Sequence, residues 1–122
     1  KFYNPVTNKK KKMKLLDNYD FFALPSISES FGLAILESLG RRVPVLTTNK
    51  TPWIEVQTKN SGWIINDSLI ELKLVLYEIF NTSKEEIFKK RKNTINVVKN
   101  FETRKISKLY LKTYKNLILN NY

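Results

Sequence analysis

Three short apolar runs, separated by segments with helical spacing, constrain the fold of this chain more than any other feature. The runs cover residues 20–24, 43–48 and 62–65, and helices are predicted over residues 9–17 and 32–39. Buried strands that alternate with helices over short connections are typical of βα units around a parallel sheet. We therefore predict an α/β fold in which the three runs form neighbouring parallel strands.

The second half of the chain has a different pattern. Two hydroxyl residues are each followed three positions later by a carboxylate, which is the signature of a capping box at a helix start. These pairs are Ser68 with Glu71 and Ser83 with Glu86. A third helix is predicted over residues 102–120. The chain is long enough for one domain, so we divide it into an α/β part, residues 1–66, and a helical part, residues 67–122.

Several classes of site are excluded by composition. The chain contains neither cysteine nor histidine, so it cannot by itself form a thiolate or imidazole metal site, a cysteine nucleophile or a serine–histidine triad. No apolar run reaches the roughly 18 residues that span a bilayer, and nothing resembles a signal peptide. The chain starts with Lys1 rather than methionine, and we expect it to be a piece of a longer protein.

The net charge of +11, from 22 basic and 11 acidic side chains, has three interpretations: a nucleic-acid surface, a solvated basic face and a membrane-binding face. The basic residues are 18 lysines and only four arginines, and residues 84–115 hold 11 basic against three acidic side chains. The planar guanidinium of arginine forms bidentate hydrogen bonds with phosphates and base edges, which lysine cannot do. The scarcity of arginine therefore argues against a surface that reads nucleic acid. We favour a solvated basic face, with attraction to an anionic membrane as another interpretation.

Two carboxylates flank the predicted strand-to-helix turn that contains Gly32. Glu29 lies at the carboxyl end of a buried strand, where open α/β sheets bind ligands, and Glu37 lies about one turn inside the following helix. The unpaired amides at that helix start suit a phosphate, and Gly32 lets the backbone approach it. Carboxylates accept hydrogen bonds from hydroxyl groups. An acid on each side of a diphosphate therefore predicts a nucleotide sugar, with hexose on one side and ribose on the other.

The residues of this turn also resemble a known family. The motif Glu-x-Phe-Gly-Leu-x-x-x-Glu follows Leu-Pro-Ser and precedes Val-Pro-Val-Leu-Thr-Thr, Thr51-Pro52-Trp53 and Gly62-Trp63. Together these motifs resemble the C-terminal domain of family-four retaining glycosyltransferases, in the branch that builds bacterial lipopolysaccharide and capsule. The resemblance runs from about Phe2 to Tyr122. It implies a Rossmann-like parallel sheet, the C-terminal half of a GT-B fold, followed by a helical tail.

The resemblance assigns roles to the residues of the turn. It implies that Glu29 is the catalytic acid that binds donor-sugar hydroxyls and that Glu37 holds the ribose. The donor site would consist of Glu29, Ser30, Phe31, Gly32, Leu33 and Glu37, with the backbone amides of Phe31, Gly32 and Leu33 on the sugar and diphosphate. The donor would be a UDP- or GDP-sugar, bound without metal or other cofactor, and a hexose would pass with retention to a glycan or lipid-linked acceptor.

The same resemblance implies that part of the active site lies elsewhere. The acceptor domain and the basic pair that grips the donor phosphates would lie upstream of Lys1, so we expect no transfer activity from this chain alone. The enzyme would be cytoplasmic, with peripheral binding to the inner face of the cell membrane as a further interpretation. Three positions depart from the family, where glycine is usual: Asn4, Ser30 and Arg42. We expect Ser30 to be harmless if its φ is negative, whereas Arg42 puts the geometry of its turn in doubt.

Each singled-out residue also has a structural interpretation. Glu29 could be a solvated loop acid, and Glu37 could pair with Arg41 four residues on. Phe31 could plug the core, and Trp53 and Trp63 are more typical of core than of sugar-stacking aromatics. The lysines of residues 9–12 suit a solvated face. Two other functions remain open: a non-catalytic basic module that binds nucleic acid or acidic membrane, and a GT-B nucleotide-sugar epimerase.

Overall fold

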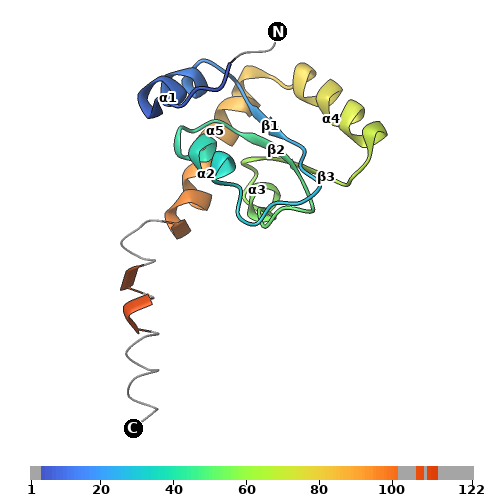
Figure 1. The fold of residues 1–122 in the computed structure, drawn as a ribbon. Coiled ribbons are helices and arrows are strands. Elements are labelled where there is room, and N and C mark those ends of the chain that lie inside the picture. Colours follow the sequence, from blue (N-terminus) through green and yellow to red (C-terminus); the bar gives the residue numbers. More distant parts are fainter. Residues whose placement is uncertain (1–3, 102–106, 109, 113–122) are drawn as a thin grey trace.

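A computed structural model describes residues 4–101, 107–108 and 110–112 of the chain. Its centre is a three-stranded parallel sheet in the order β1-β2-β3 (Figure 1). The strands are β1 (Phe22–Leu24), β2 (Val45–Thr48) and β3 (Gly62–Ile65). The register pairs Leu24 with Thr47, and Thr47 with Ile64. The carboxyl ends of all three strands therefore meet at one edge of the sheet, and the predicted α/β class with a parallel sheet is confirmed.

Helices precede, connect and follow the strands. They are α1 (Lys9–Asp17), α2 (Leu33–Gly40), α3 (Glu55–Thr58), α4 (Leu69–Asn81) and α5 (Lys84–Val98), with a 3-10 turn η1 (Lys99–Phe101) after α5. Of the helix predicted over residues 102–120, the structure describes only residues 107–108 and 110–112, which are helical, and the rest lies outside the described residues. Within the described part of the chain, no helix has the length and apolar character needed to cross a membrane.

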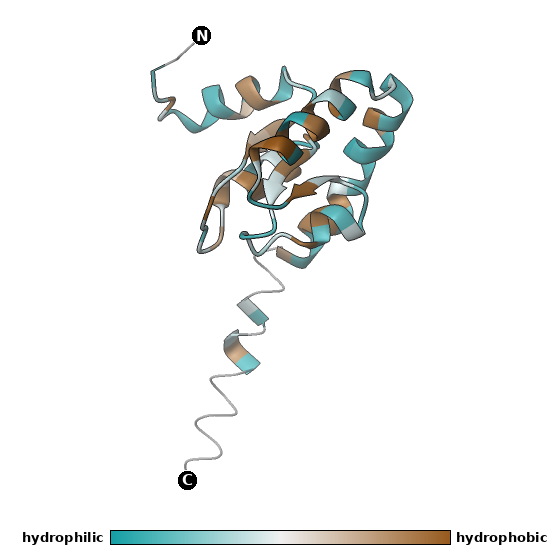
Figure 2. Ribbon diagram, turned by 90° about the vertical axis from the view of Figure 1, so that its right-hand side faces the viewer, coloured by the Kyte–Doolittle hydropathy of each residue, from teal (hydrophilic) through white to brown (hydrophobic). Residues whose placement is uncertain are grey.

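Two apolar cores lie on opposite faces of the sheet. The core between the sheet, α2, α3 and α5 contains the buried residues Ile35, Leu39, Val45, Trp53, Val56 and Val97. The core between the sheet and α4 contains Leu46, Trp63, Ile65 and Ile79. Figure 2 shows the apolar colour concentrated on the strands and inner helix faces, with hydrophilic residues outside. Because neighbouring residues of β2 point to opposite faces, Val45 and Leu46 contribute to different cores.

The predicted capping residues begin both long helices of the second half. The Ser68 hydroxyl accepts a hydrogen bond from the Glu71 amide at 3.4 Å, and the Ser83 hydroxyl accepts one from the Glu86 amide at 3.2 Å. The Glu71 carboxylate accepts a bond from the Asn66 amide, so it secures the chain before the helix. The sequence pattern missed α3, because a single turn of four residues carries no apolar periodicity.

The end of α2 is closed by a left-handed residue. Gly40 is the last residue of the helix, and Arg42, two residues on, has a φ of 60°. The Arg42 amide donates to the Leu39 carbonyl and the Val43 amide donates to the Ser38 carbonyl, both at 3.0 Å. This is the hydrogen-bond pattern of a Schellman motif, whose left-handed position is usually glycine. A glycine at this position, which the resemblance implies, would have a conformational reason, and Arg42 adopts the same geometry.

Candidate functional site

The loop of residues 25–32 joins the carboxyl end of β1 to the start of α2. Its first residues are held by two threonines of β2. The Thr47 hydroxyl donates to the Leu24 carbonyl at 2.9 Å, and the Thr48 hydroxyl donates to the Ser26 carbonyl at 2.5 Å. Both threonines are buried. These bonds fix the direction in which the chain leaves the sheet, and they place the predicted site residues at the strand edge where parallel α/β sheets bind ligands.

Glu29 is oriented by a local hydrogen bond. The Ser26 hydroxyl donates to Oε1 of Glu29 at 3.1 Å, and the Glu29 side chain is half-buried rather than freely solvated. A carboxylate has about four lone-pair positions, so one bond from Ser26 leaves acceptor capacity for a ligand. Ser30 has no positive φ, which is the condition under which we expected serine to be harmless at this position.

Phe31 is anchored from both its ring and its backbone. Its ring centroid lies 5.3 Å from that of Trp53 and 5.6 Å from that of Phe101. The Trp53 indole N–H donates to the Phe31 carbonyl, and Trp53 is only 1% exposed. Trp53 is therefore a core residue that supports the loop, as its structural interpretation predicted. Trp63, which is 6% exposed in β3, is also a core residue.

Gly32 forms the turn into α2, and its conformation favours glycine. Its φ is +76°, in the left-handed region. A Cβ at this position would lie 3.1 Å from Cδ1 of Ile35 and 3.1 Å from Nε1 of Trp53. The left-handed φ and the two close neighbours explain why glycine stands at this turn, whereas the approach of the Gly32 backbone to a ligand stays a prediction.

The start of α2 differs from the starts of α1, α4 and α5, and like that of the single-turn α3 it has no side-chain cap. Asn8, Ser68 and Ser83 each cap their helices through a side-chain oxygen, whereas Gly32 precedes α2 and offers none. The first amides that bond within α2 are those of Ile35 and Leu36, both to the Gly32 carbonyl. The helix amides before Ile35, from Leu33 and Ala34, are the orphan donors of this terminus. Orphan amides and the positive end of the helix dipole favour an anion here.

Glu37 points away from the partner that its sequence neighbours suggest. Arg41 forms an ion pair with Asp17 at 2.5 Å, so the possible Glu37–Arg41 pair does not form. This contact with Arg41 holds the pKa of Asp17 below its usual value, chiefly through the hydrogen bond. Glu37 instead lies 2.7 Å from Nζ of Lys12. Lys12 is half-buried, so the expectation that the lysine run of residues 9–12 is wholly a solvated face is wrong for this residue.

A cavity of about 260 Å³ lies beside this ion pair. Glu37 and Lys12 contribute its charged groups, and apolar side chains of α1, α2 and β1 complete its wall. The lining residues are Val6, Lys12, Leu15, Leu16, Phe22, Ala34 and Glu37. Glu29 does not line it, so the structure does not join the two acids in this cavity. Within the described residues, no group of three or more acidic side chains is placed to hold a metal ion.

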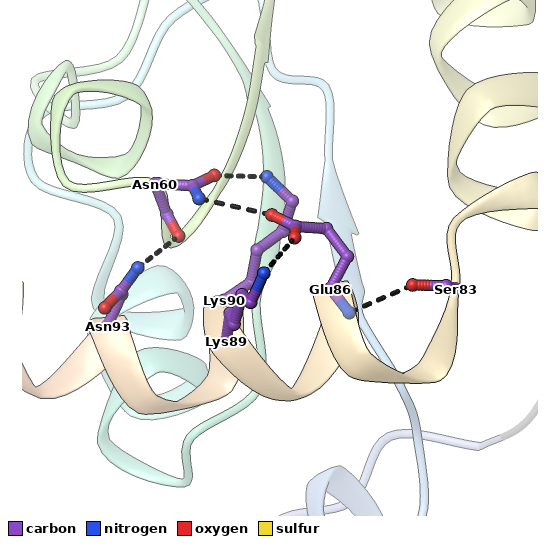
Figure 3. A network of polar contacts seen from close by, with 6 residues as sticks. All are labelled: Asn60, Ser83, Glu86, Lys89, Lys90 and Asn93. Carbon is purple, nitrogen blue, oxygen red and sulfur yellow. Dashed lines mark hydrogen bonds and ion pairs between the residues drawn. The ribbon is translucent and has the colours of Figure 1, made fainter.

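A polar network between α5 and the turn after α3 explains part of the basic charge. Lys90 Nζ donates to Oδ1 of Asn60 at 2.6 Å (Figure 3). It also lies 4.7 Å from the centroid of the Trp63 ring. Asn60 also donates to Glu86 at 3.4 Å, and Asn93 donates to the Asn60 carbonyl at 3.2 Å. Burial lowers the pKa of Lys90 below its ordinary value. Lys90 is therefore a structural cation, which composition alone does not distinguish from surface charge.

The comparison with protein families decides the assignment of this fold. The family model described as glycosyl transferases group 1 matches residues 1–72, more than half of the chain. The chain belongs to this family. The match includes all three strands, the loop of residues 25–32 and α2, and therefore every residue of the predicted donor site. No curated protein matches the chain closely enough to add a finer assignment. This group 1 glycosyltransferase domain thus has the Rossmann-like architecture predicted from its sequence.

Proposed function

We propose that this group 1 glycosyltransferase domain binds a UDP- or GDP-sugar across the start of α2. The observation that carries the proposal is the uncapped α2 N-terminus, with Glu29 before it and Glu37 within its second turn. The orphan amides at Leu33 and Ala34 suit the diphosphate. Glu29 would accept bonds from donor-sugar hydroxyls, and Glu37 from ribose hydroxyls. The cavity beside Glu37, with its apolar wall, offers a place for the base.

The proposed reaction is transfer of a hexose to a glycan or lipid-linked acceptor with retention of configuration. The leaving diphosphate accumulates negative charge as the glycosidic bond breaks, and fixed amides at a helix start stabilise such charge without reorganising. One well-placed donor of this kind contributes about 3–4 kcal/mol to a transition state. The departing diphosphate would take the acceptor proton, so the proposal needs neither histidine nor a metal from this chain. The acceptor would bind to a second domain.

The two acids can be tested separately by varying the ligand. The protein would be titrated with UDP, GDP and their hexose conjugates at millimolar concentrations, with backbone amide shifts recorded by NMR. We expect shifts at residues 29–37. Glu37→Gln should weaken the binding of nucleotides and of nucleotide sugars alike. Glu29→Gln should remove only the additional affinity that the hexose contributes to nucleotide-sugar binding.

The control is Glu85→Gln, which removes an exposed carboxylate from the first turn of α5. This variant should bind every ligand as the unchanged protein does. The proposal is wrong if neither nucleotide series shifts residues 29–37, or if all three substitutions have the same effect.

We also propose peripheral contact with an anionic membrane through the exposed face of α5. Lys84, Phe88, Lys92 and Ile95 recur every three or four residues along this face, and the Phe88 side chain is 58% exposed. Lys92 Nζ lies 4.6 Å from the Phe88 ring centroid. Alternating cations and apolar side chains suit the boundary between headgroups and acyl chains.

This contact is tested by sedimentation with vesicles. We expect binding to vesicles that contain phosphatidylglycerol, none to vesicles of phosphatidylcholine alone, and loss of binding in Phe88→Ser. Binding of duplex DNA with a steep salt dependence, and no binding to vesicles, would instead favour a basic nucleic-acid module.

A further inference from the structure

The ion pair between Lys12 and Glu37 joins two helices that are far apart in the sequence. Lys12 Nζ lies 2.7 Å from each carboxylate oxygen of Glu37, and it donates a hydrogen bond to Oε1. The side chains are 38% and 30% exposed, so the contact is partly shielded from water. A second ion pair joins Asp17, the last residue of α1, to Arg41, the C-cap residue of α2. The two ion pairs together hold α1 beside α2 and keep the Lys12 ammonium group next to the Glu37 carboxylate.

This contact affects what Glu37 can do in the proposed donor site. A free carboxylate beside the ribose would accept hydroxyl hydrogen bonds, but it would also repel the diphosphate of the same ligand. The repulsion is strengthened where protein replaces water, because the effective dielectric constant falls. A paired carboxylate avoids this conflict, since Lys12 offsets its charge while about four lone-pair positions leave room for further donors.

We propose that Lys12 is a positioning residue that neutralises Glu37, so that Glu37 can bind a ribose without repelling the attached diphosphate. This inference rests on the proposed donor site. Lys12 acts through Glu37, and its contribution grows with the number of phosphates on the ligand. A purely structural ion pair would instead affect all ligands equally, through the position of α1.

The test uses ligands that differ only in charge. The protein and its Lys12→Met variant would be titrated with uridine, UMP and UDP, and with guanosine, GMP and GDP, by NMR. We expect Lys12→Met to lower the affinity for the diphosphate about tenfold, which corresponds to about 1.4 kcal/mol. The affinity for the monophosphate should fall less, and that for the nucleoside should change by no more than about twofold. Lys12→Arg keeps the charge and should restore diphosphate binding.

The matched control is Lys10→Met, which removes the same charge from an exposed position of α1. It should leave all affinities unchanged, and the amide spectrum of each variant reports whether α1 is still folded. The inference is overturned if Lys12→Met weakens every ligand in a series equally, or if it tightens diphosphate binding, which would make Lys12 a competitor for Glu37. If neither series binds the unchanged protein, the proposed donor site itself is wrong.

Discussion

Two residues with left-handed backbone, Gly32 and Arg42, bracket α2 and determine how the helix is joined to the sheet. Gly32 begins the helix beside Trp53, and Arg42 closes its Schellman motif. An L-residue in this region costs about 1–2 kcal/mol relative to its usual conformations. Replacing the glycine at position 32 should therefore destabilise the protein, whereas introducing a glycine at position 42 should stabilise it.

Gly32→Ala should destabilise the protein and weaken the proposed donor binding. The new Cβ would meet Ile35 and Trp53 at 3.1 Å in addition to the left-handed strain, so we expect a loss of about 2 kcal/mol in the free energy of unfolding. Urea denaturation followed by circular dichroism measures this. Gly40→Ala is the control, because a Cβ there meets no atom within 4 Å and alanine favours the helix by about 0.5–1 kcal/mol. Equal destabilisation by both substitutions would contradict the explanation.

Arg42→Gly should stabilise the protein by about 0.5–1 kcal/mol, because relief of left-handed strain exceeds the extra freedom of glycine in the unfolded chain. Thermal unfolding of the two proteins at equal concentration checks this. Arg42→Ala removes the same side chain but keeps Cβ, so it should give no such gain. A gain in both variants would mean that removing a positive charge, rather than changing the backbone, is responsible.

At the scale of elements, α5 is tied to the turn after α3 through the Asn60 network. Lys90 lies at the centre of this network, where its ammonium group donates to Asn60 and lies over the face of the Trp63 ring. Asn60 itself has a φ of 48°, which asparagine tolerates better than most residues. The hydrogen bond from Asn60, followed by that from Lys89, holds the pKa of Glu86 below its ordinary value.

The lowered pKa of Lys90 predicts a pH dependence of stability. Burial disfavours the charged form in the folded protein, so over the interval between the folded pKa and about pH 10.4 the unfolded chain binds more protons. The contribution of Lys90 to the free energy of unfolding should therefore rise with pH through this interval. Urea denaturation of the protein and of Lys90→Met between pH 7 and 10.5 measures it. The difference between the two should grow with pH, and a constant or falling difference would contradict the prediction.

For the whole molecule, the central strand β2 joins two cores, so loss of either core should unfold both. Leu46→Ala removes a fully buried side chain from the core beneath α4 and should cost about 2–5 kcal/mol. Leu74→Ala, at a side chain that is 65% exposed on α4, is the matched control and should change stability by less than about 0.5 kcal/mol. Circular dichroism and tryptophan fluorescence should report one coincident transition. Separate transitions would show that the two faces are independent.

The alternation of apolar runs was sufficient to predict the sheet, because each strand is short and buried and each long helix has its own start signal. Residue spacing also placed Glu29 and Gly32 at the strand edge, since both lie in the loop that follows β1. The partners of Glu37 and Lys90 could not be predicted in this way. Lys12 lies 25 residues before Glu37, and Asn60 lies 30 residues before Lys90, so those contacts depend on how α1 and α5 pack rather than on local pattern.

Helix α1 is attached to the rest of the domain by other interactions than the other long helices. None of its residues is buried, and it meets α2 through the two ion pairs and a cavity rather than through a close-packed apolar seam. Electrolyte shortens the range of such attractions, to about 8 Å at physiological ionic strength and about 3 Å at 1 M. Concentrated potassium chloride should thus detach α1 while the sheet stays intact. The carboxylate of Glu37 would then be uncovered, and nucleotide affinity would depend on the ionic content of the surrounding fluid.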